Sequence, residues 1–297
     1  MLGHTFLLSL VAASLMPSGG LAQYDLPRKE PRCDDSVWPG IGEYLREQFT
    51  DDHGGCTQLA AQAVRLPFHD CFPDGGCDGS ILLTDECTSR AENQQMVPLC
   101  RMLYGIHHDS HIGAADLINF AASIANKACP YGPFIPFYVG RRDRQYAAPL
   151  NQLPSATTSA KDMLNIFARK GFSPEDLVAL TDEMDSPKYY TEVLLGSAPA
   201  ILPSDKHLAL DPATTNIWQL YARSQYAWDQ AYINGMLKLI LKGNKVHEML
   251  DCSHLVHETF EYDDQYSGPN SYHNPQAWEK CEEAAVVAVA GLLYGRQ

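Results

Sequence analysis

The chain has 297 residues, of which 45% are hydrophobic, and its formal net charge is −14. This length is sufficient for one large domain with a sizeable core. The strong negative charge disfavours nucleic acid and anionic membrane surfaces as partners, because both are themselves negative.

The first 22 residues are typical of a secretory signal peptide. An apolar run from Phe6 to Met16 precedes small residues, with Gly20 and Ala22 at positions suited to cleavage. The run is too short to span a bilayer, and no later segment reaches that length. We therefore expect a secreted protein whose mature chain starts at residue 23 and has no membrane anchor.

Nine cysteines follow the predicted cleavage site, and disulfide bonds are their expected use in an exported protein. An odd number leaves at least one thiol free or paired between chains. No Cys-x-x-Cys occurs, which disfavours a zinc cluster. The cysteines are Cys33, Cys56, Cys71, Cys77, Cys87, Cys100, Cys129, Cys252 and Cys281.

Apolar side chains recur with helical spacing along most of the chain. Ser173 and Gly171 lie where a helix N-cap and a helix stop are expected. The best strand signal, 133–143, is short, so the sequence predicts an all-α protein. The Pro- and Gly-rich loop between Cys129 and Pro154 is expected to divide it into two lobes, about 23–145 and 146–297. The predicted helices cover 41–49, 57–68, 112–128, 155–171, 173–183, 215–243 and 275–295.

Arg65 and His69 are spaced by one helical turn and are expected to share a helix face. A neutral imidazole there accepts a proton from a bound peroxide, and the guanidinium stabilises negative charge on the leaving oxygen. The alternative is an ordinary solvent-facing Arg/His pair.

The loop that follows carries hard oxygen donors, which suit Ca²⁺. The candidate ligands are Asp70, Gly76, Asp78 and Ser80. Cys71 and Cys77 flank the loop and are able to close it as a disulfide. The alternative is a solvated acidic turn.

Three segments together resemble the plant, fungal and bacterial haem peroxidase superfamily, and most closely its secreted fungal, class II-like members. "RLPFHDCFPDGGCDGSILL" resembles the distal helix and calcium loop, and "IGAADLINFAASIANKACPYGPFIPFYVGRRD" resembles the central helix and the segment after it. "FSPEDLVAL" resembles the start of the proximal helix. The resemblance is collinear and continues through "YYTEVLLG" and "LPSDKHLALD".

The resemblance implies a two-lobed helical fold and a monomeric enzyme that oxidises small phenolic or aromatic donors with hydrogen peroxide. It implies Arg65 and His69 as catalytic residues, Phe68 over the face of haem b, and one distal Ca²⁺ held by the four loop residues. It also implies disulfides Cys56–Cys129, Cys252–Cys281 and Cys71–Cys77. Cys33, Cys87 and Cys100 remain, and one further bond is expected among them.

The chain departs from this family at the proximal side of the haem. The family carries an iron-ligating histidine shortly after "LVAL", but no histidine occurs between His111 and His207. An ungapped comparison puts Met184 at the ligand position, whereas a gapped one leaves that position and the proximal calcium loop missing. Asp205 matches the carboxylate that holds the family's proximal histidine.

Two further family sites are altered. The family's distal asparagine orients the distal histidine, and Asn93 is a weak candidate for it because its spacing is unusual. The manganese-oxidising members carry carboxylates where this chain has Gln58 and Gln62. Amides bind Mn²⁺ poorly, so manganese oxidation at this position is not expected.

Two histidine groups leave other functions open: His107, His108 and His111, and His247, His254 and His257. If they met in space, they would suit a non-haem copper oxidase. If they do not, solvated surface histidines are the simpler interpretation. A second alternative is a haem-free pseudo-peroxidase that keeps the calcium-stabilised scaffold for binding.

Overall fold

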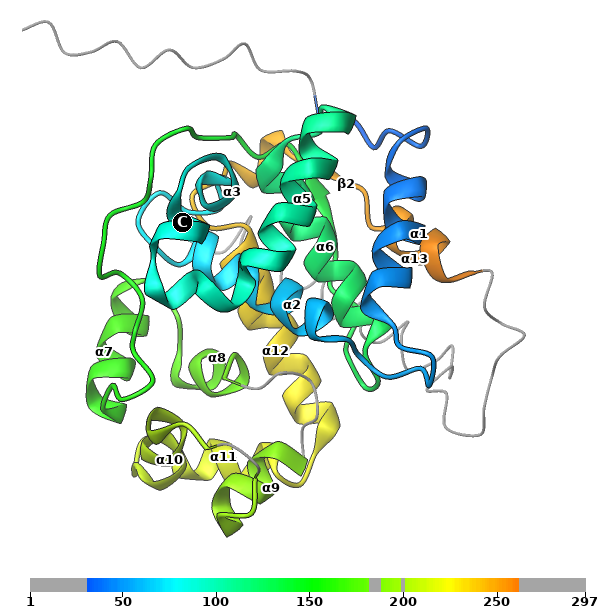
Figure 1. Cartoon of the computed structure of the whole chain (residues 1–297). Helices are drawn as coiled ribbons and strands as arrows, with labels where there is room; N and C mark the ends of the chain where they lie inside the picture. Colours follow the sequence, from blue (N-terminus) through cyan, green and yellow to red (C-terminus); the bar gives the residue numbers. More distant parts are fainter. Residues whose placement is uncertain (1–30, 182–187, 199–200, 262–297) are drawn as a thin grey trace, which may run out of the picture.

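The computed structural model describes residues 31–181, 188–198 and 201–261. Helices make up most of this part of the chain, with one small sheet (Figure 1), as the sequence predicts. The predicted signal peptide, Met184, Cys281 and the helix predicted at 275–295 lie outside the described residues. No helix in the described ranges is long and apolar enough to cross a bilayer.

The first group of helices surrounds the central helix. It consists of α1 (Trp38–Phe49), α2 (Gln58–Cys71), α3 (Ser80–Leu83), α4 (Glu86–Ser89), the 3-10 helix η1 (Ala91–Met96), α5 (Val97–Ser110) and α6 (Ala114–Ala128).

The second group follows a long connection. It consists of α7 (Ala160–Arg169), α8 (Pro174–Ala179), α9 (Lys188–Leu195), α10 (Pro203–Leu210), α11 (Thr215–Tyr221), α12 (Gln225–Ile240), the 3-10 helix η2 (Val246–Glu248) and α13 (His254–Glu261).

Helix α6 lies at the centre of the first group and is buried on all sides over most of its length. Its many alanines allow α2 and α1 to pack closely against it. Trp38 of α1 packs edge-on against Phe120, with ring centroids 4.8 Å apart, and against Phe137 at 5.1 Å. This packing holds α2, which carries Arg65 and His69, against a rigid support.

Helices α8 and α12 connect the second group to the first, because α12 packs against both α8 and α2, and α13 packs against α1 and α6 of the first group. Figure 1 shows α9, α10 and α11 gathered beyond α8. Ser173 caps α8 in a reciprocal capping box with Asp176, as its position predicts, and Ser159 caps α7, which begins later than the helix predicted from residue 155. The predicted helix at 215–243 is two helices, α11 and α12.

The small sheet pairs β1 (Tyr138–Val139) with β2 (Leu250–Asp251) in antiparallel orientation, with Tyr138 opposite Asp251. β1 lies within the best strand signal of the sequence. Its partner comes from more than a hundred residues later, so the sheet ties the end of the described chain to the segment that follows α6.

Four disulfides join the described cysteines: Cys33–Cys252, Cys56–Cys129, Cys71–Cys77 and Cys87–Cys100. The expected pairs Cys56–Cys129 and Cys71–Cys77 are confirmed, and so is one further bond among the remaining three cysteines. The expected pair Cys252–Cys281 is wrong, because Cys252 is bonded to Cys33. The N-terminal segment lies beside β2, with Cys33 Sγ 3.5 Å from the carbonyl oxygen of Asp251, and so brings Cys33 to Cys252.

Candidate functional site

Arg65 and His69 lie on one face of α2, one turn apart. Thr57 begins this helix, and its side-chain oxygen accepts a hydrogen bond from the Ala60 amide at 3.3 Å. The Arg65 Nε donates to His69 Nε2 at 3.0 Å, so the two side chains touch as the sequence predicts. The alternative of a solvent-facing pair is wrong for His69, which is only 6% exposed.

Asn93 completes a buried hydrogen-bonded chain behind His69. Its Oδ1 lies 2.7 Å from His69 Nδ1, and its Nδ2 donates to the backbone carbonyl of Glu86 at 3.0 Å. The guanidinium of Arg65 has no acceptor, so His69 Nε2 must accept and Nδ1 must carry the proton. Arg65 and Asn93 together therefore select one neutral tautomer of the imidazole.

The electrostatics reinforce this neutral state. Burial lowers the pKa of His69 to about 4, and the positive charge of Arg65 acts in the same direction, while the bond to Asn93 opposes both. A neutral imidazole whose electron pair lies on Nε2 is a proton acceptor over a wide pH range, once the hydrogen bond from Arg65 is released. Arg65 also donates from Nη1 to Gln95 Oε1 at 3.2 Å, which holds the guanidinium beside the ring.

Phenylalanines form a wall beside this pair. Phe68 stacks on Phe72 of the same chain segment at 4.5 Å and on Phe167 of α7 at 5.9 Å, measured between ring centroids. Phe68 also lies edge-on to His69, with ring centroids 6.0 Å apart, so an apolar ring borders the imidazole on this side.

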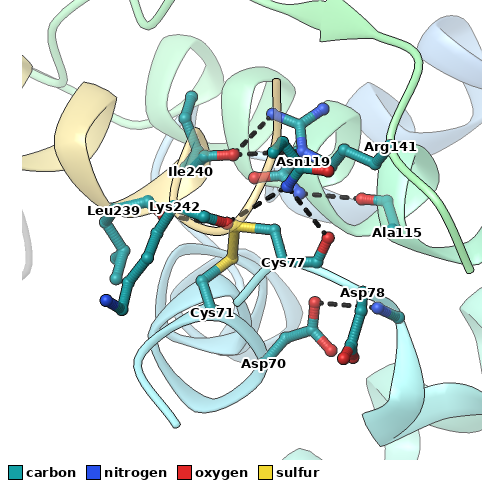
Figure 2. The surroundings of a disulfide bond; sticks show 12 residues. Asp70, Cys71, Cys77, Asp78, Ala115, Asn119, Arg141, Leu239, Ile240 and Lys242 are labelled. Carbon is teal, nitrogen blue, oxygen red and sulfur yellow. Dashed lines mark hydrogen bonds between the residues drawn. A yellow bond between two sulfur atoms is a disulfide. The ribbon is translucent and has the colours of Figure 1, made fainter. Parts of the chain in front are cut away.

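The candidate calcium loop follows directly. Asp70 Oδ2 accepts from the Gly79 amide at 3.0 Å, and Asp78 Oδ1 accepts from the Ser80 amide at 3.1 Å. Figure 2 shows both carboxylates beside the Cys71–Cys77 disulfide. Gly76 has a φ of +82°, and a Cβ there would lie 2.4 Å from the Lys242 carbonyl oxygen, so this position requires glycine.

The charge of this loop fits a cation. Asp70, Asp78 and Ser80 are all buried. Burial raises the pKa of Asp70 well above its usual value, and the nearby negative charge of Asp78 raises it further. Arg144 reaches Asp78 from one side, with its Nη1 3.4 Å from Oδ2. A calcium ion bound by these oxygens and by backbone carbonyls would relieve the repulsion.

No cluster of three or more His, Cys, Asp or Glu side chains positioned to hold a metal occurs in the described ranges. Asp70 and Asp78 supply two carboxylates, so a cation here also needs the hydroxyl of Ser80 and backbone oxygens. Gln58 is exposed at the start of α2, and the Gln62 amide oxygen accepts from the Leu99 amide at 3.3 Å.

The histidines of the two groups contact other residues rather than one another. His107 Nδ1 lies 2.5 Å from the Ile112 carbonyl oxygen, and His108 is paired with its neighbour Asp109. His257 stacks on Phe134, with ring centroids 4.2 Å apart, and His254 lies near Asp35. The described residues thus do not form the shared histidine cluster that a copper site would need.

In the second helix group, Asp205 has a hydrogen-bond partner that the sequence did not predict. It lies in the first turn of α10 and is 4% exposed. Tyr189, at the start of α9, donates its hydroxyl hydrogen bond to Asp205 Oδ2, and Ser204 Oγ donates to Oδ1 at 3.1 Å. Its carboxylate therefore accepts from two hydroxyl groups.

A neutral, buried histidine beside an arginine can accept a proton while the guanidinium stabilises negative charge. A family model for peroxidases matches residues 43–182. The low-redox potential peroxidase of Taiwanofungus camphoratus is 28% identical over 76% of this chain and 78% of its own length.

Other fungal relatives agree. Manganese peroxidase 3 of Phlebia radiata is 24% identical over 73% of this chain and 75% of its own length. A peroxidase of Arthromyces ramosus is 23% identical over 81% of both chains. The family model and these relatives support a similarity of this chain to the haem peroxidase superfamily.

Whether haem fits this chain depends on which side chains are available on the distal and on the proximal side. The distal side fits, because neutral His69, Arg65 and the Phe68 wall are in place. On the proximal side the described residues offer no imidazole beside Asp205. His207 is exposed, and its Nδ1 lies 3.3 Å from the Thr158 carbonyl oxygen. The donors that touch Asp205 are the hydroxyl groups of Tyr189 and Ser204.

Proposed function

We propose that this chain is a secreted peroxidase that uses hydrogen peroxide to oxidise small phenolic or aromatic donors. The observation that carries the proposal is the hydrogen-bonded chain from Arg65 through His69 to Asn93. Secretion is supported by the signal-like N-terminus and the disulfides, because disulfides persist in oxidising compartments.

His69 is the proton carrier in this proposal. Its Nε2 takes the proton of a bound peroxide and returns it to the distal oxygen as the O–O bond breaks. To do so, it must first lose its hydrogen bond from Arg65, whose Nε occupies the same lone pair. Asn93 keeps Nδ1 protonated throughout and so keeps Nε2 ready to accept.

Arg65 is the electrostatic partner. Its N–H groups, once turned from His69 Nε2 toward the peroxide, stabilise negative charge on the leaving oxygen. The Phe68 wall keeps this charge in a medium of low dielectric, where the interaction is stronger than in water. Haem, when bound, supplies the electrons that reduce the peroxide and the oxidising power passed on to the donor.

Calcium is the second proposed cofactor. Asp70, Gly76, Asp78 and Ser80 are proposed to hold one ion directly after His69 in the chain. The buried, mutually repelling carboxylates support this role. The ion would stabilise the end of α2 and thereby the orientation of His69.

The test uses the full-length protein purified after secretion and reconstituted with haemin and Ca²⁺. Peroxide-dependent oxidation of a phenolic donor is measured for the wild type and for His69→Ala. His108→Ala is the matched control, because His108 is an exposed histidine of α5. We expect turnover in the wild type and the control and its loss in His69→Ala. A wild type without turnover would identify the chain as a non-catalytic member that keeps the scaffold for binding.

A further inference from the structure

A polar cleft of about 420 Å³ lies beside the candidate calcium loop, and its size is within the range of small-molecule binding sites. Three segments form it: the loop after α2, the segment after β1 and the loop after α12. None of the described residues that line it is aromatic or branched aliphatic, so it suits a small polar ligand better than an aromatic donor. Its charged lining residues are Asp78, Arg142, Asp143, Arg144, Lys245 and Glu248.

The acidic side chains of the cleft already have hydrogen-bond donors. The two oxygens of Asp143 accept from backbone amides at the start of α6, at 2.8 and 2.9 Å. Glu248 Oε1 accepts from Lys245 Nζ at 3.0 Å, and Asp78 Oδ1 accepts from the Ser80 amide. Asp143 and Glu248 are thus stabilised from within the protein, and Asp78 belongs to the candidate calcium loop.

Arg144 is a cation of the cleft whose hydrogen bonds are incomplete. Its Nη1 lies 3.4 Å from Asp78 Oδ2, which is long for a charge-assisted pair, and its Nε is buried with no hydrogen-bond partner among the described residues. The side chain is 37% exposed, and glycine at position 75 leaves room for it, because a Cβ there would lie 2.7 Å from Nη1. A partly exposed ion pair contributes little free energy, so Arg144 can leave Asp78 for a better acceptor at small cost.

We propose that this cleft binds a small oxyanion with two negative charges, a dicarboxylate or a phosphate, and that Arg144 and Lys245 hold it. A guanidinium can hold an oxyanion through two parallel hydrogen bonds, and the flexible ammonium group of a lysine adds a second charge. In the structure each of these two side chains has one carboxylate partner, Asp78 for Arg144 and Glu248 for Lys245, so both keep further N–H groups for a ligand.

Asp78 couples this cleft to the candidate calcium loop. Arg144 donates to Asp78 Oδ2, and so its positive charge lies at a carboxylate that the proposed calcium ion would use. When Arg144 turns toward a bound oxyanion, its charge leaves Asp78 and repels calcium less. By linkage, each ligand then raises the affinity for the other by the same factor, which we expect to be roughly fivefold. This coupling rests on the calcium part of the proposed function, whereas the oxyanion site itself does not.

The experiment titrates the full-length protein with succinate and, separately, with inorganic phosphate in a calorimeter, at an ionic strength held constant with chloride. We expect at least one probe to bind, and Arg144→Gln to weaken its binding by roughly tenfold, because a charged donor is lost. Lys245→Gln should also weaken it and leaves Asp78 untouched. Arg223→Gln is the matched control, at an exposed arginine that donates to Gln219, and should keep the wild-type affinity. Added Ca²⁺ should tighten binding in the wild type but not in Arg144→Gln.

The outcomes separate this proposal from the proposed function. Binding of neither probe, or equal affinity in the wild type and in both cleft variants, would overturn the oxyanion site. If Arg144→Gln does not fold, Lys245→Gln decides, and an unchanged affinity there overturns the proposal. An affinity of the wild type that does not respond to Ca²⁺ would overturn the coupling. Oxyanion binding by a wild type without peroxide turnover would support this site and reject the enzyme.

Discussion

Asn93 Oδ1 lies 2.7 Å from His69 Nδ1, and this bond fixes the protonation state of the residue that would carry the proton. Asn93→Ala removes the acceptor and leaves the ring free to change tautomer. The expected slowing of the peroxide reaction is about tenfold, the equivalent of one hydrogen bond of ~1.4 kcal/mol. Stopped-flow mixing of the reconstituted protein with peroxide measures it. An unchanged rate constant would mean that Asn93 only packs against the ring.

The low pKa of His69 predicts how the rate constant for the reaction with peroxide depends on pH. The imidazole accepts a proton only when neutral, and its pKa of about 4 keeps it neutral at pH values where a free histidine is largely charged. The rate constant for peroxide should therefore fall only below about pH 4 and stay level from there to neutrality.

Arg65 is one cause of that low pKa, so its removal should shift the profile. In Arg65→Leu the positive charge is lost, the pKa of His69 rises, and the acid limb moves to higher pH. Arg101→Leu, at an exposed position of α5, is the control and should leave the limb in place. An acid limb that does not move in Arg65→Leu would contradict the electrostatic coupling of the two side chains.

The calcium proposal predicts a stability effect with a distinctive sign. Added Ca²⁺ should raise the Tm of the wild type, because it binds only the folded loop. Asp70→Asn should abolish this response, yet without Ca²⁺ it should be at least as stable as the wild type, because one of two repelling charges is gone. Asp74→Asn, at an exposed position of the same loop paired with Lys170, should keep the response. Equal Ca²⁺ responses in both variants would refute the site.

The Cys33–Cys252 disulfide predicts which peptides stay linked in a non-reducing digest. It also predicts a loss of stability when the bond is removed. Non-reducing peptide mapping should recover Cys33 linked to Cys252. The bond closes a loop of 219 residues, so Cys33→Ser with Cys252→Ser should cost about 5 kcal/mol of unfolding free energy in the chain-entropy model. Recovery of Cys252 linked to Cys281 would contradict the pairing.

The sequence predicted the features that depend on local residue patterns. Helical periodicity predicted the all-α class, and Ser173 predicted the start of α8. Arg65 and His69 were predictable because one helical turn brings them together whatever the rest of the chain does. The hard oxygen donors of the loop predicted the candidate calcium ligands, and the resemblance added the expected haem and two of the disulfides that the structure shows.

The remaining features depend on contacts between distant segments. Asn93 reaches His69 from a short 3-10 helix, so family spacing made it a weak candidate. Cys33 meets Cys252 because the N-terminal segment lies beside β2, which no local pattern reports. The Tyr189–Asp205 bond depends on the packing of α9 against α10. In the sequence, Tyr189 is a tyrosine in a helical pattern and Asp205 is a carboxylate in the first turn of a helix. Neither pattern indicates that the two side chains touch.

The central claim is that Arg65 and His69 cleave peroxide together, and one measurement tests it most directly. The second-order rate constant of the haemin-reconstituted protein with hydrogen peroxide is compared among the wild type, His69→Ala, Arg65→Leu and the double variant. We predict a loss of about a hundredfold or more for His69→Ala, and a double variant little worse than the worse single variant, because the pair acts as a unit. A His69→Ala variant that reacts with peroxide as fast as the wild type would contradict the account.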